Sequence, residues 1–500
     1  MRTSLLCTEA RLGSALVATC LSLLALAQNE DDALRVSTNT PGGTARSIGL
    51  ANAFGALGAD GSAISTNPAG FGLFRTSELS ISPAFEVNDV KSVYNGTSAS
   101  DTRSRFYIGN MTLAFNSPSK AGSDWRSSTF GVAFDRVATH HWSRQAVGER
   151  VGSSILDDFA IQAAGILPDS LFKFMPFSAG LAYDTYGIDP NDTLGTSYSA
   201  VLPFGADVKQ VHTIDSRGAN STTSFFYSTN WMDQFYVGLS LGIVGHRFVR
   251  TTTHTETTLD EAIDLKDLTY KENLTITGNG IDVKGGVIWR MSDRFRAGVA
   301  FHSPQWTQLN DAYTMLVTTN FRSADAQGRT AYSATSPDGI FNYRVNTPWR
   351  AVLSAAYIAG GHGLVSVDHE YVDYRNARFK PSNKLVDPHD FAFENQVIKE
   401  RFRAVHSVRV GTEWRSGNWY FRAGWGFVPD PYVKTDPRHG QAQKTYAGGV
   451  GYRTDHFGID LGLNYQQRST NFYQYDPALV SVTNEVRSTV RTLVTMSLRP

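Results

Sequence analysis

Apolar and polar residues alternate with a period of two in many segments of this chain, for example at positions 235–243, 281–290 and 457–465. In a β-strand this spacing places an apolar row on one face and a row of glycine and charged residues on the other. Aromatic residues stand near the ends of the apolar rows, as Trp349 and Tyr357 do. Each segment has about the 9–11 residues that cross a bilayer at a tilt. A soluble β-sandwich also alternates, but its aromatics need not mark strand ends, so the pattern favours a transmembrane β-barrel.

The alternating segments predict an all-β fold, a fourteen-stranded antiparallel transmembrane β-barrel over residues 77–500. The expected strands are 77–87, 104–116, 127–138, 221–231, 234–249, 279–290, 294–303, 348–358, 363–373, 402–414, 418–427, 444–453, 456–467 and 488–499. Short turns and long loops alternate between them, as is typical when turns face the periplasm and loops face outside. The interior of a barrel with more than about eight strands is too wide for its own side chains to fill.

Residues 28–76 are expected to fill that lumen as an N-terminal, partly helical hatch (plug). Their central stretch, 45–74, is rich in glycine and alanine and nearly uncharged. We expect Ser62 to cap a short helical turn. Asn67-Pro68 predicts a second helical start, because a proline at the first helical position gives up only an N–H that has no partner there. On these local features alone, a helix–turn–helix lid is the alternative.

Residues 1–27 are expected to be a signal peptide. Arg2 and Arg11 precede an apolar run at 15–26, and Ala25–Ala27 suits cleavage before Gln28. No apolar stretch of about 18 residues follows the signal, so no transmembrane helix is expected in the mature chain. An exported chain of this kind belongs to the periplasm, the outside or the outer membrane, and the barrel pattern favours the bacterial outer membrane.

Both cysteines, Cys7 and Cys20, fall in the predicted signal. The mature chain is therefore expected to have no disulfide, no cysteine metal site and no cysteine nucleophile. A lipoprotein anchored at Cys20 is the weaker alternative. The chain has 46 Lys+Arg and 46 Asp+Glu residues, so its charges balance. It therefore lacks the excess of positive charge that is typical of proteins that bind nucleic acid.

Residues 139–220 interrupt the alternation and are expected to form a large extracellular loop. Within it, 153–174 has apolar residues at helical spacing. A connection of this length is uncommon unless it serves a function. Its apolar residues are candidates for an outer capture surface, and the alternative is a loop helix packed on itself. The candidates are Ile166, Leu167, Leu171, Phe172 and Phe174.

The hatch and several barrel segments resemble the outer-membrane long-chain fatty-acid transporter family (FadL-like), in its Bacteroidetes-type branch. In the hatch the resemblance rests on Thr44–Ser47, Gly49, Ala53-Phe54, Asp60–Ile64 and above all Asn67–Gly70. In the barrel it rests on the blocks at 347–357, 366–374 and 407–415. The resemblance covers essentially the whole mature chain. The chain departs from the family at Leu498–Pro500, where an aromatic end is usual.

The resemblance implies uptake of hydrophobic compounds across the outer membrane, in first place long-chain fatty acids. In the family, ligand is captured at extracellular loops, moves to a pocket above the hatch, and leaves sideways through a wall opening at a kinked strand. Haem (hemin) and aromatic hydrocarbons are alternative cargoes. We expect a monomer without a cofactor, whose partners are the hydrophobic ligand, outer-membrane lipid, lipopolysaccharide and the outer-membrane assembly machinery.

Asn67, Pro68 and Ala69 are the candidate gating residues, with a purely structural turn as the alternative. The candidate pocket residues in the hatch and barrel are Phe71, Leu73, Phe74, Arg290 and Arg350. The three apolar ones alternatively pack the plug against the wall. Lumen-facing arginines suit a substrate carboxylate, but they also suit a network with lumen acids. Further arginines of this kind are Arg296, Arg403 and Arg409, and the acids are Asp282, Asp368, Glu370 and Glu413.

The sequence does not predict an enzyme or a metal site. No Gly-x-Ser-x-Gly motif, HExxH motif or phosphate loop appears. His140 and His141 are adjacent and would point to opposite faces of a strand, which argues against a shared metal or haem site. The rival interpretations are an open porin, a surface antigen or adhesin, and an outer-membrane lipid hydrolase.

Overall fold

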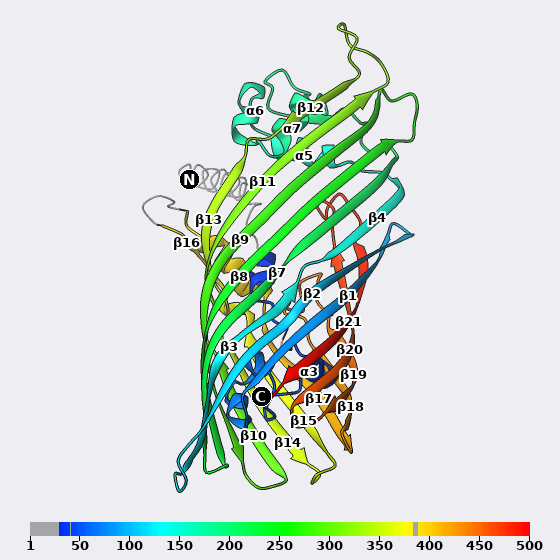
Figure 1. Cartoon of the computed structure of the whole chain (residues 1–500). Coiled ribbons are helices and arrows are strands. Elements are labelled where there is room, and N and C mark those ends of the chain that lie inside the picture. Colours follow the sequence, from blue (N-terminus) through cyan, green and yellow to red (C-terminus); the bar gives the residue numbers. More distant parts are fainter. Residues whose placement is uncertain (1–29, 41, 384–388) are drawn as a thin grey trace, which may run out of the picture.

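The computed structural model describes residues 30–40, 42–383 and 389–500. The predicted signal peptide, the two cysteines and the expected cleavage site before Gln28 lie outside the described residues. The chain forms a closed antiparallel barrel of fourteen strands, as the sequence predicts (Figure 1). The barrel closes where the first strand, β1 (Glu78–Tyr94), pairs with the last, β21 (Thr483–Leu498).

Most barrel strands are single continuous segments. They are β1, β21, β2 (Thr97–Pro118), β7 (Val208–Trp231), β8 (Phe235–Thr258), β9 (Leu265–Arg290), β15 (Gly363–Asp373), β17 (Ala404–Ser416), β18 (Trp419–Val428), β19 (Gln443–Arg453) and β20 (Phe457–Phe472).

Three barrel strands are interrupted. The third consists of β3 (Trp125–Thr139) and β4 (Trp142–Val151). The seventh consists of β10 (Phe295–His302) and β11 (Trp306–Phe321), and the eighth of β13 (Gly339–Asn346) and β14 (Arg350–Ile358). Pro304 and Pro348 stand in the last two breaks, where their missing N–H groups interrupt the ladder.

The smaller elements lie at the ends of the barrel and inside it. The other strands are β5 (Ile188–Pro190), β6 (Tyr198–Ala200), β12 (Ala331–Thr335) and β16 (Arg378–Pro381). The helices are α2 (Glu30–Ser37), α3 (Ala45–Gly49), α4 (Ala63–Thr66), η2 (Pro68–Leu73), α5 (Ile155–Ala163), α6 (Pro168–Phe174), α7 (Ala179–Asp184), η3 (Tyr374–Asn376) and α8 (Ala392–Arg401). None of the described helices is long and apolar enough to cross a membrane.

Outward-facing side chains form an apolar band around the barrel. On β8 the band consists of Val237, Leu239, Leu241 and Ile243, all exposed. Aromatic residues bound it at the short-turn end, where Phe235 stacks on Trp289 with ring centroids 5.7 Å apart. An exposed apolar band with aromatic rims is the surface of a membrane-embedded barrel.

Several strands continue far beyond the predicted ends, towards the long loops. Residues 250–278, expected as a loop, belong mostly to β8 and β9, and the predicted loop 139–220 contains β4 and the first half of β7. Above the apolar band both faces of these strands carry polar residues, such as Thr251–Thr253. The alternation that identified the strands is therefore absent there, although the backbone ladder continues.

The segment 153–174, in which helical spacing was noted, forms two helices, α5 and α6. Gly165, with φ +85°, and Pro168 separate them. Gly165 adopts a left-handed conformation that ends α5, and Pro168 begins α6 at its first turn. Ser154 caps α5 in a complete capping box with Asp157.

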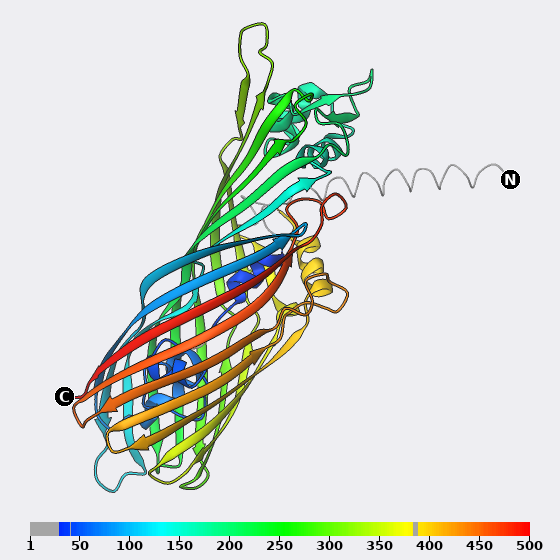
Figure 2. The same ribbon diagram turned by 90° about the vertical axis from the view of Figure 1, so that its right-hand side faces the viewer.

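The hatch lies inside the barrel, where Figure 2 shows its helices enclosed by strands. Asn67 Oδ1 accepts the N–H of Ala69 at 3.1 Å, which confirms the predicted cap of the Pro68 helix. Ser62 begins α4 as expected, but its hydroxyl donates to Asp60 instead of capping the helix.

Hatch and wall are joined by buried polar contacts. Arg46 donates to both carboxylate oxygens of Glu413 at 3.0 and 2.9 Å. Asp368 accepts the backbone N–H groups of Phe54 and Gly55 at 2.8 and 2.9 Å. Glu413 and Asp368 belong to β17 and β15, so the hatch is held from one side of the barrel by carboxylates.

Asn67 joins the hatch to a second part of the wall, at β8 and β9. Its amide Nδ2 donates to the carbonyl of Gly55 at 2.8 Å and to that of Val287 on β9 at 3.3 Å. A side chain at Gly238 of β8 would come within 2.4 Å of the Ala69 nitrogen, so only glycine permits this approach. The Asn67–Ala69 turn therefore packs directly on the barrel backbone.

We expect Asn67→Asp to loosen the hatch without unfolding the barrel. The carboxylate cannot donate to the carbonyls of Gly55 and Val287, and each such loss costs about 1–3 kcal/mol at a buried site. Single-channel conductance in planar bilayers should rise above that of the parent protein. Asn95→Asp, in the exposed hairpin turn after β1, is the matched control and should leave conductance unchanged. Equal conductance of Asn67→Asp and the parent protein would show that this contact does not hold the plug.

Candidate functional site

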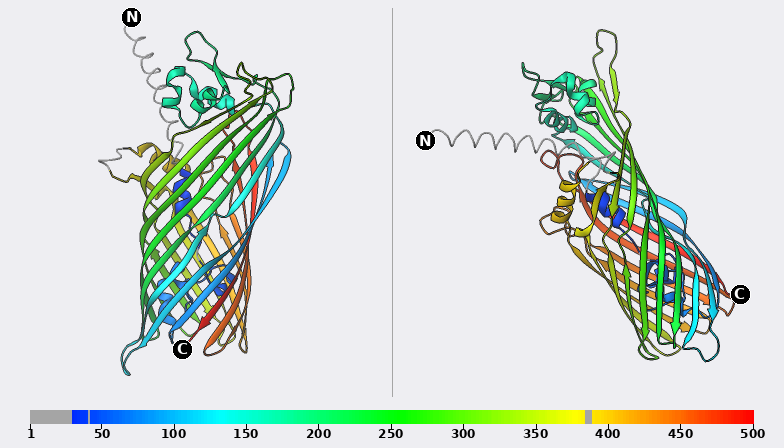
Figure 3. Two further views of the ribbon diagram at one scale, coloured as in Figure 1. Left: turned by 45° about the horizontal axis from the view of Figure 1, so that its top comes forward. Right: turned by 90° about the vertical axis from the view of Figure 1, so that its left-hand side faces the viewer.

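Helices α5, α6 and α7 form a cap over the long-loop end of the barrel, which both views of Figure 3 show. Their buried side chains pack against the extended parts of β4, β7 and β9. Leu171 is fully buried in this core, and Ile166 is partly buried against it. Leu167, Phe172 and Phe174 are 55%, 38% and 52% exposed. Three of the five proposed capture residues therefore remain available at the surface.

A buried polar cluster fixes the cap to the barrel. Glu256 on β8 accepts the N–H of Ile155 at 2.8 Å and the hydroxyl of Ser154, and so holds the start of α5. His254 lies 2.9 Å from the same carboxylate, and His212 is its neighbour on β7. Burial lowers the pKa of His212 well below its ordinary value, and His254 lowers it further. The cap is thus attached to the barrel by hydrogen bonds at the start of α5 as well as by its apolar core.

An apolar cluster occupies the lumen below the cap, around α2. We call it the lumen cluster. Its members are Ala33, Leu34, Val36, Phe248, Leu274, Ile276, Leu309, Tyr343, Val345, Ala377, Phe379, Phe391, Ile398, Phe402 and Tyr432. Rings from β13, β16 and the segment before α8 stack there, with Phe379 and Phe391 centroids 5.5 Å apart. An aromatic surface of this kind can hold an apolar molecule.

The helix α2 fills this cluster with its own side chains and is tied in place by charges. Arg438 pairs with Glu30 at 2.9 Å and with Asp31 at 2.7 Å. Arg35 lies over the ring of Phe248 at 3.9 Å. The N-terminal helix therefore occupies the space that a hydrophobic ligand would need.

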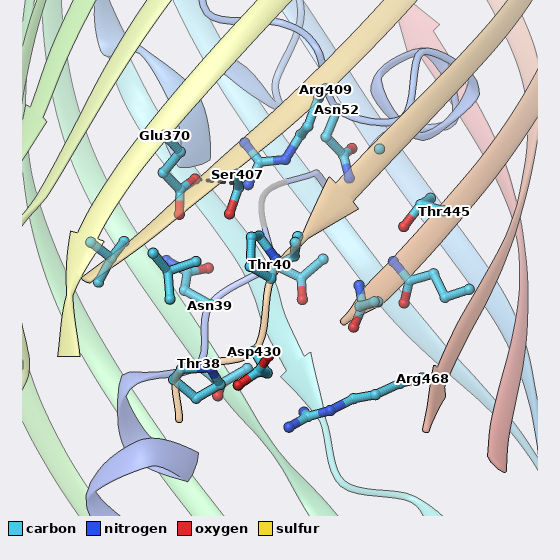
Figure 4. A pocket seen from close by; sticks show the side chains of 18 of the residues that line it. Thr38, Asn39, Thr40, Asn52, Glu370, Ser407, Arg409, Asp430, Thr445 and Arg468 are labelled. Atoms are coloured by element: carbon cyan, nitrogen blue, oxygen red, sulfur yellow. Dashed lines mark hydrogen bonds and ion pairs between the residues drawn. The ribbon is translucent and has the colours of Figure 1, made fainter. Parts of the chain in front are cut away.

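A polar cavity of about 90 Å³ adjoins the lumen cluster, and Figure 4 shows its lining. Leu34 borders both. Glu370 pairs with Arg409 at 2.8 Å and with Arg350 at 2.9 Å, so both arginines already have an acidic partner. Arg468 of β20 also points into the cavity, and it forms no ion pair with any described residue.

The other lumen arginines of the sequence analysis are spread over the barrel. Arg290 pairs with Asp293 in a short turn at 2.7 Å, far along β9 from the cavity. Arg403 pairs with Asp430 at 3.3 Å. Arg296 has no ion pair among the described residues and does not line the cavity. Of the two candidate pocket arginines, Arg350 lines this cavity and Arg290 does not. Arg468 was not predicted, because the end of β20 lacks apolar alternation.

Phe71, Leu73 and Phe74 lie in the lower hatch. Phe71 stacks on Phe226 of β7 with ring centroids 3.7 Å apart, and Phe74 packs beside it. Leu73 packs near Tyr236 of β8. These side chains lie between plug and wall, and none of them lines the polar cavity.

The backbone ladder between β2 and β3 is incomplete. It joins 110–118 to 127–135 and stops at the pair Asn110–Asp135. Beyond that pair, β4 is linked to β1 and β2 through side chains, as when Asn88 donates to the carbonyl of His141 at 2.8 Å. We call this discontinuity the wall seam. His140 and His141 mark the break between β3 and β4 and bond to different partners, Asn220 and the Ser104 carbonyl.

Hatch residues lie directly behind the wall seam. Thr40 donates its N–H to the carbonyl of Val137, at a register shift in β3, at 2.9 Å. Gly43 has φ +114°, and a side chain there would meet Asp135 at 2.1 Å. These contacts could not be predicted from the sequence, because a register shift leaves no mark in the alternation.

No protein-family model and no curated protein matches this chain. Solved structures do resemble it. The Ralstonia pickettii toluene transporter TbuX is 14% identical with a TM-score of 0.50, and the alignment covers 92% of this chain and 99% of that one. The P. putida toluene transporter TodX is 12% identical with a TM-score of 0.52, over 92% and 99% of the two chains.

A Pseudomonas aeruginosa FadL homologue is also 12% identical, with a TM-score of 0.53 over 92% of this chain and 98% of that one. Identities this low describe the fold. The closed fourteen-stranded barrel agrees with these structures over nearly the full length. The chain therefore has the fold of the FadL-like outer-membrane transporters.

Proposed function

We propose that this protein takes up hydrophobic compounds across the outer membrane, in first place long-chain fatty acids, with the long-loop end outside. The proposal rests on three features that follow one another along the barrel. They are the exposed apolar side chains on the cap, the lumen cluster below it, and the wall seam. The similar structures support hydrophobic cargo, because two are toluene transporters and one is a FadL homologue.

Capture takes place on α6 of the cap. Leu167, Phe172 and Phe174 offer apolar surface outside the membrane, and covering that surface with a hydrophobic compound is favourable at about 25 cal/mol per Å². A compound bound there has left water before it enters the lumen.

Replacing Leu167, Phe172 and Phe174 together by serine should weaken binding of a labelled fatty acid to the purified protein by about tenfold, which is the loss of about 1.4 kcal/mol of apolar contact. Equilibrium binding in detergent measures it. Phe204→Ser removes a more exposed ring from the connection before β7 and should have little effect. Similar losses in both variants would mean that the protein binds the compound through general surface hydrophobicity.

Arg468 distinguishes the two leading cargoes. It lies in the polar cavity beside the lumen cluster and has no acidic partner among the described residues. A fatty acid that displaces α2 from the lumen cluster can place its chain there and its carboxylate at Arg468, whose fork of N–H groups suits a carboxylate. An aromatic hydrocarbon such as toluene has no carboxylate for that guanidinium to bind.

We expect Arg468→Gln to weaken palmitate binding by about tenfold, the size of one charge-assisted contact, and to leave toluene binding unchanged. Competition binding with both ligands on the same preparation measures the difference. Arg415→Gln, at an exposed short turn, is the matched control. If palmitate binds the Arg468 variant as well as it binds the parent protein, the cargo is not held by its carboxylate in this cavity.

Exit is sideways through the wall seam, under control of the hatch. Since β2 and β4 share no backbone ladder above Asn110, they can separate without breaking main-chain hydrogen bonds to each other. Asn67, Pro68 and Ala69 fix the hatch to β8 and β9, so they govern release. Uptake of fatty acid by cells carrying Asn67→Asp should change while binding at the cap stays the same.

A disulfide across the wall seam should stop uptake. The side chains of Asp101 on β2 and Ser143 on β4 are hydrogen bonded to each other, and no cysteine follows Cys20 to interfere. We expect oxidised Asp101→Cys/Ser143→Cys to bind labelled fatty acid normally, to lose uptake, and to regain it on reduction.

The matched control is Leu113→Cys/Val132→Cys. These residues face each other in the continuous part of the β2–β3 ladder, where cross-linked strands are already joined. Uptake should survive oxidation in this control. Normal uptake by the oxidised seam variant would rule out lateral exit at this place.

A further inference from the structure

A second pocket, of about 270 Å³, lies in the barrel wall above the apolar band. It is distinct from the polar lumen cavity and shares no residue with it. Its lining residues come from β2, β3, β7, β8 and β9. They are Arg105, Arg136, Gly218, Ala219, Ser221, Gly245, His246, Arg247, Gly278 and Asn279.

Three guanidinium groups meet at this pocket without a carboxylate. Arg105, Arg136 and Arg247 form no ion pair with any residue in the described part of the chain. Arg105 donates only to the carbonyl of Gly218 at 3.2 Å, and Arg136 lies 5.5 Å from the ring of Tyr107. The nearby Glu86 is already bonded to Arg491 and Thr139.

The space between these guanidinium groups is unfilled. At Gly245 an added side chain would meet nothing closer than Ser221 at 3.6 Å. The side chain of His246, which stands between Gly245 and Arg247 on β8, points to the lumen face instead. Cationic and polar groups thus surround an unfilled volume.

The pocket lies at the upper edge of the membrane. On β8 the exposed apolar residues end at Ile243, and Gly245 and Arg247 follow on the same face. On β9 they end at Ile281, and Asn279 follows. Arg136 directly follows Asp135, at which the wall seam begins. Headgroups of membrane lipids occupy this depth, beside the point where the wall ladder is interrupted.

We propose that this pocket binds the oxyanion headgroup, phosphate or carboxylate, of an amphiphile whose apolar chain lies along the barrel surface. Arginine is suited to both groups, since its planar fork donates two parallel hydrogen bonds. The apolar side chains below the pocket on β8 and β9 receive the chain. This site does not depend on transport, because an anchored membrane lipid would bind in the same way.

The test uses the whole mature protein in detergent and measures bound ligands by native mass spectrometry. The probes are bis-phosphorylated lipid A, dephosphorylated lipid A, palmitate and methyl palmitate. One variant is Arg105→Gln/Arg136→Gln/Arg247→Gln. A second, Gly245→Leu, fills the pocket and keeps every charge, so that the two variants test charge and space separately.

The matched control is Arg344→Gln. Arg344 is an exposed arginine on β13 that bonds only to the Pro381 carbonyl, and it stands in the same cross-strand row as Asn279, through Gln308. Heat-dependent migration on gels verifies that each variant is a folded barrel.

Both pocket variants should bind one anionic probe about tenfold or more weakly than the parent protein does, and should bind its uncharged counterpart as the parent protein does. The control variant should bind both probes as the parent protein does. If binding of phosphorylated lipid A is lost, the ligand of the pocket is the phosphate of a membrane lipid. If binding of palmitate is lost but binding of methyl palmitate is kept, the ligand is a free carboxylate. If all four probes bind both folded variants as they bind the parent protein, the pocket is not an anion site. Failure of uptake in any variant does not bear on this result.

Discussion

Backbone hydrogen bonding in lipid is the constraint on which this structure depends. A strand in the hydrocarbon region has no water to satisfy its N–H and C=O groups, so the sheet must close. Closure is achieved by pairing β1 with β21. Backbone hydrogen bonds continue even beside the proline breaks. The N–H of Ser303 donates to the Val283 carbonyl at 2.9 Å, and the N–H of Thr347 donates to the Gln305 carbonyl at 3.1 Å. Against this background the interrupted ladder between β2 and β3 is an exception.

Closure with fourteen strands creates a second constraint, because the lumen must be occupied. The hatch meets this need with small residues that approach the wall closely and with charges that fix its position. Arg422 pairs with Glu413 at 2.6 Å and with Asp460 at 2.7 Å, and Glu413 also holds Arg46. Removing one member of a buried ionic group costs about 3–5 kcal/mol, so such a network specifies one hatch position.

The sequence predicted the features that follow from burial in lipid. Period-two alternation located every membrane-crossing segment, and strand β15 has the predicted bounds 363–373. The Asn67 cap was also predictable, since it depends on neighbouring residues only. The extensions of β7, β8 and β9 were not, because both of their faces are polar above the membrane and the alternation disappears.

The sites were less predictable than the fold, because they depend on contacts between distant strands. Arg290 and Arg350 look alike in sequence, yet one pairs within a short turn and the other lies at the lumen cavity. Leu171 and Phe172 are neighbours on one helix, and only Phe172 faces solvent. Helical spacing gives the relative orientation of such residues, but it does not say which side the barrel covers.

The positions of the hatch and the wall seam have a common consequence. At the register shift in β3 the carbonyl of Val137 turns inward, and Thr40 of the hatch supplies its hydrogen bond. Gly43 lies against Asp135 at the start of the wall seam. Because an unpaired buried carbonyl is costly, β3 keeps its bent course most easily while the hatch is in place. Movement of residues 40–43 would remove that support and the packing behind the wall seam together. The plug and the side wall are therefore linked by the same few residues, and a change in one must be compensated in the other.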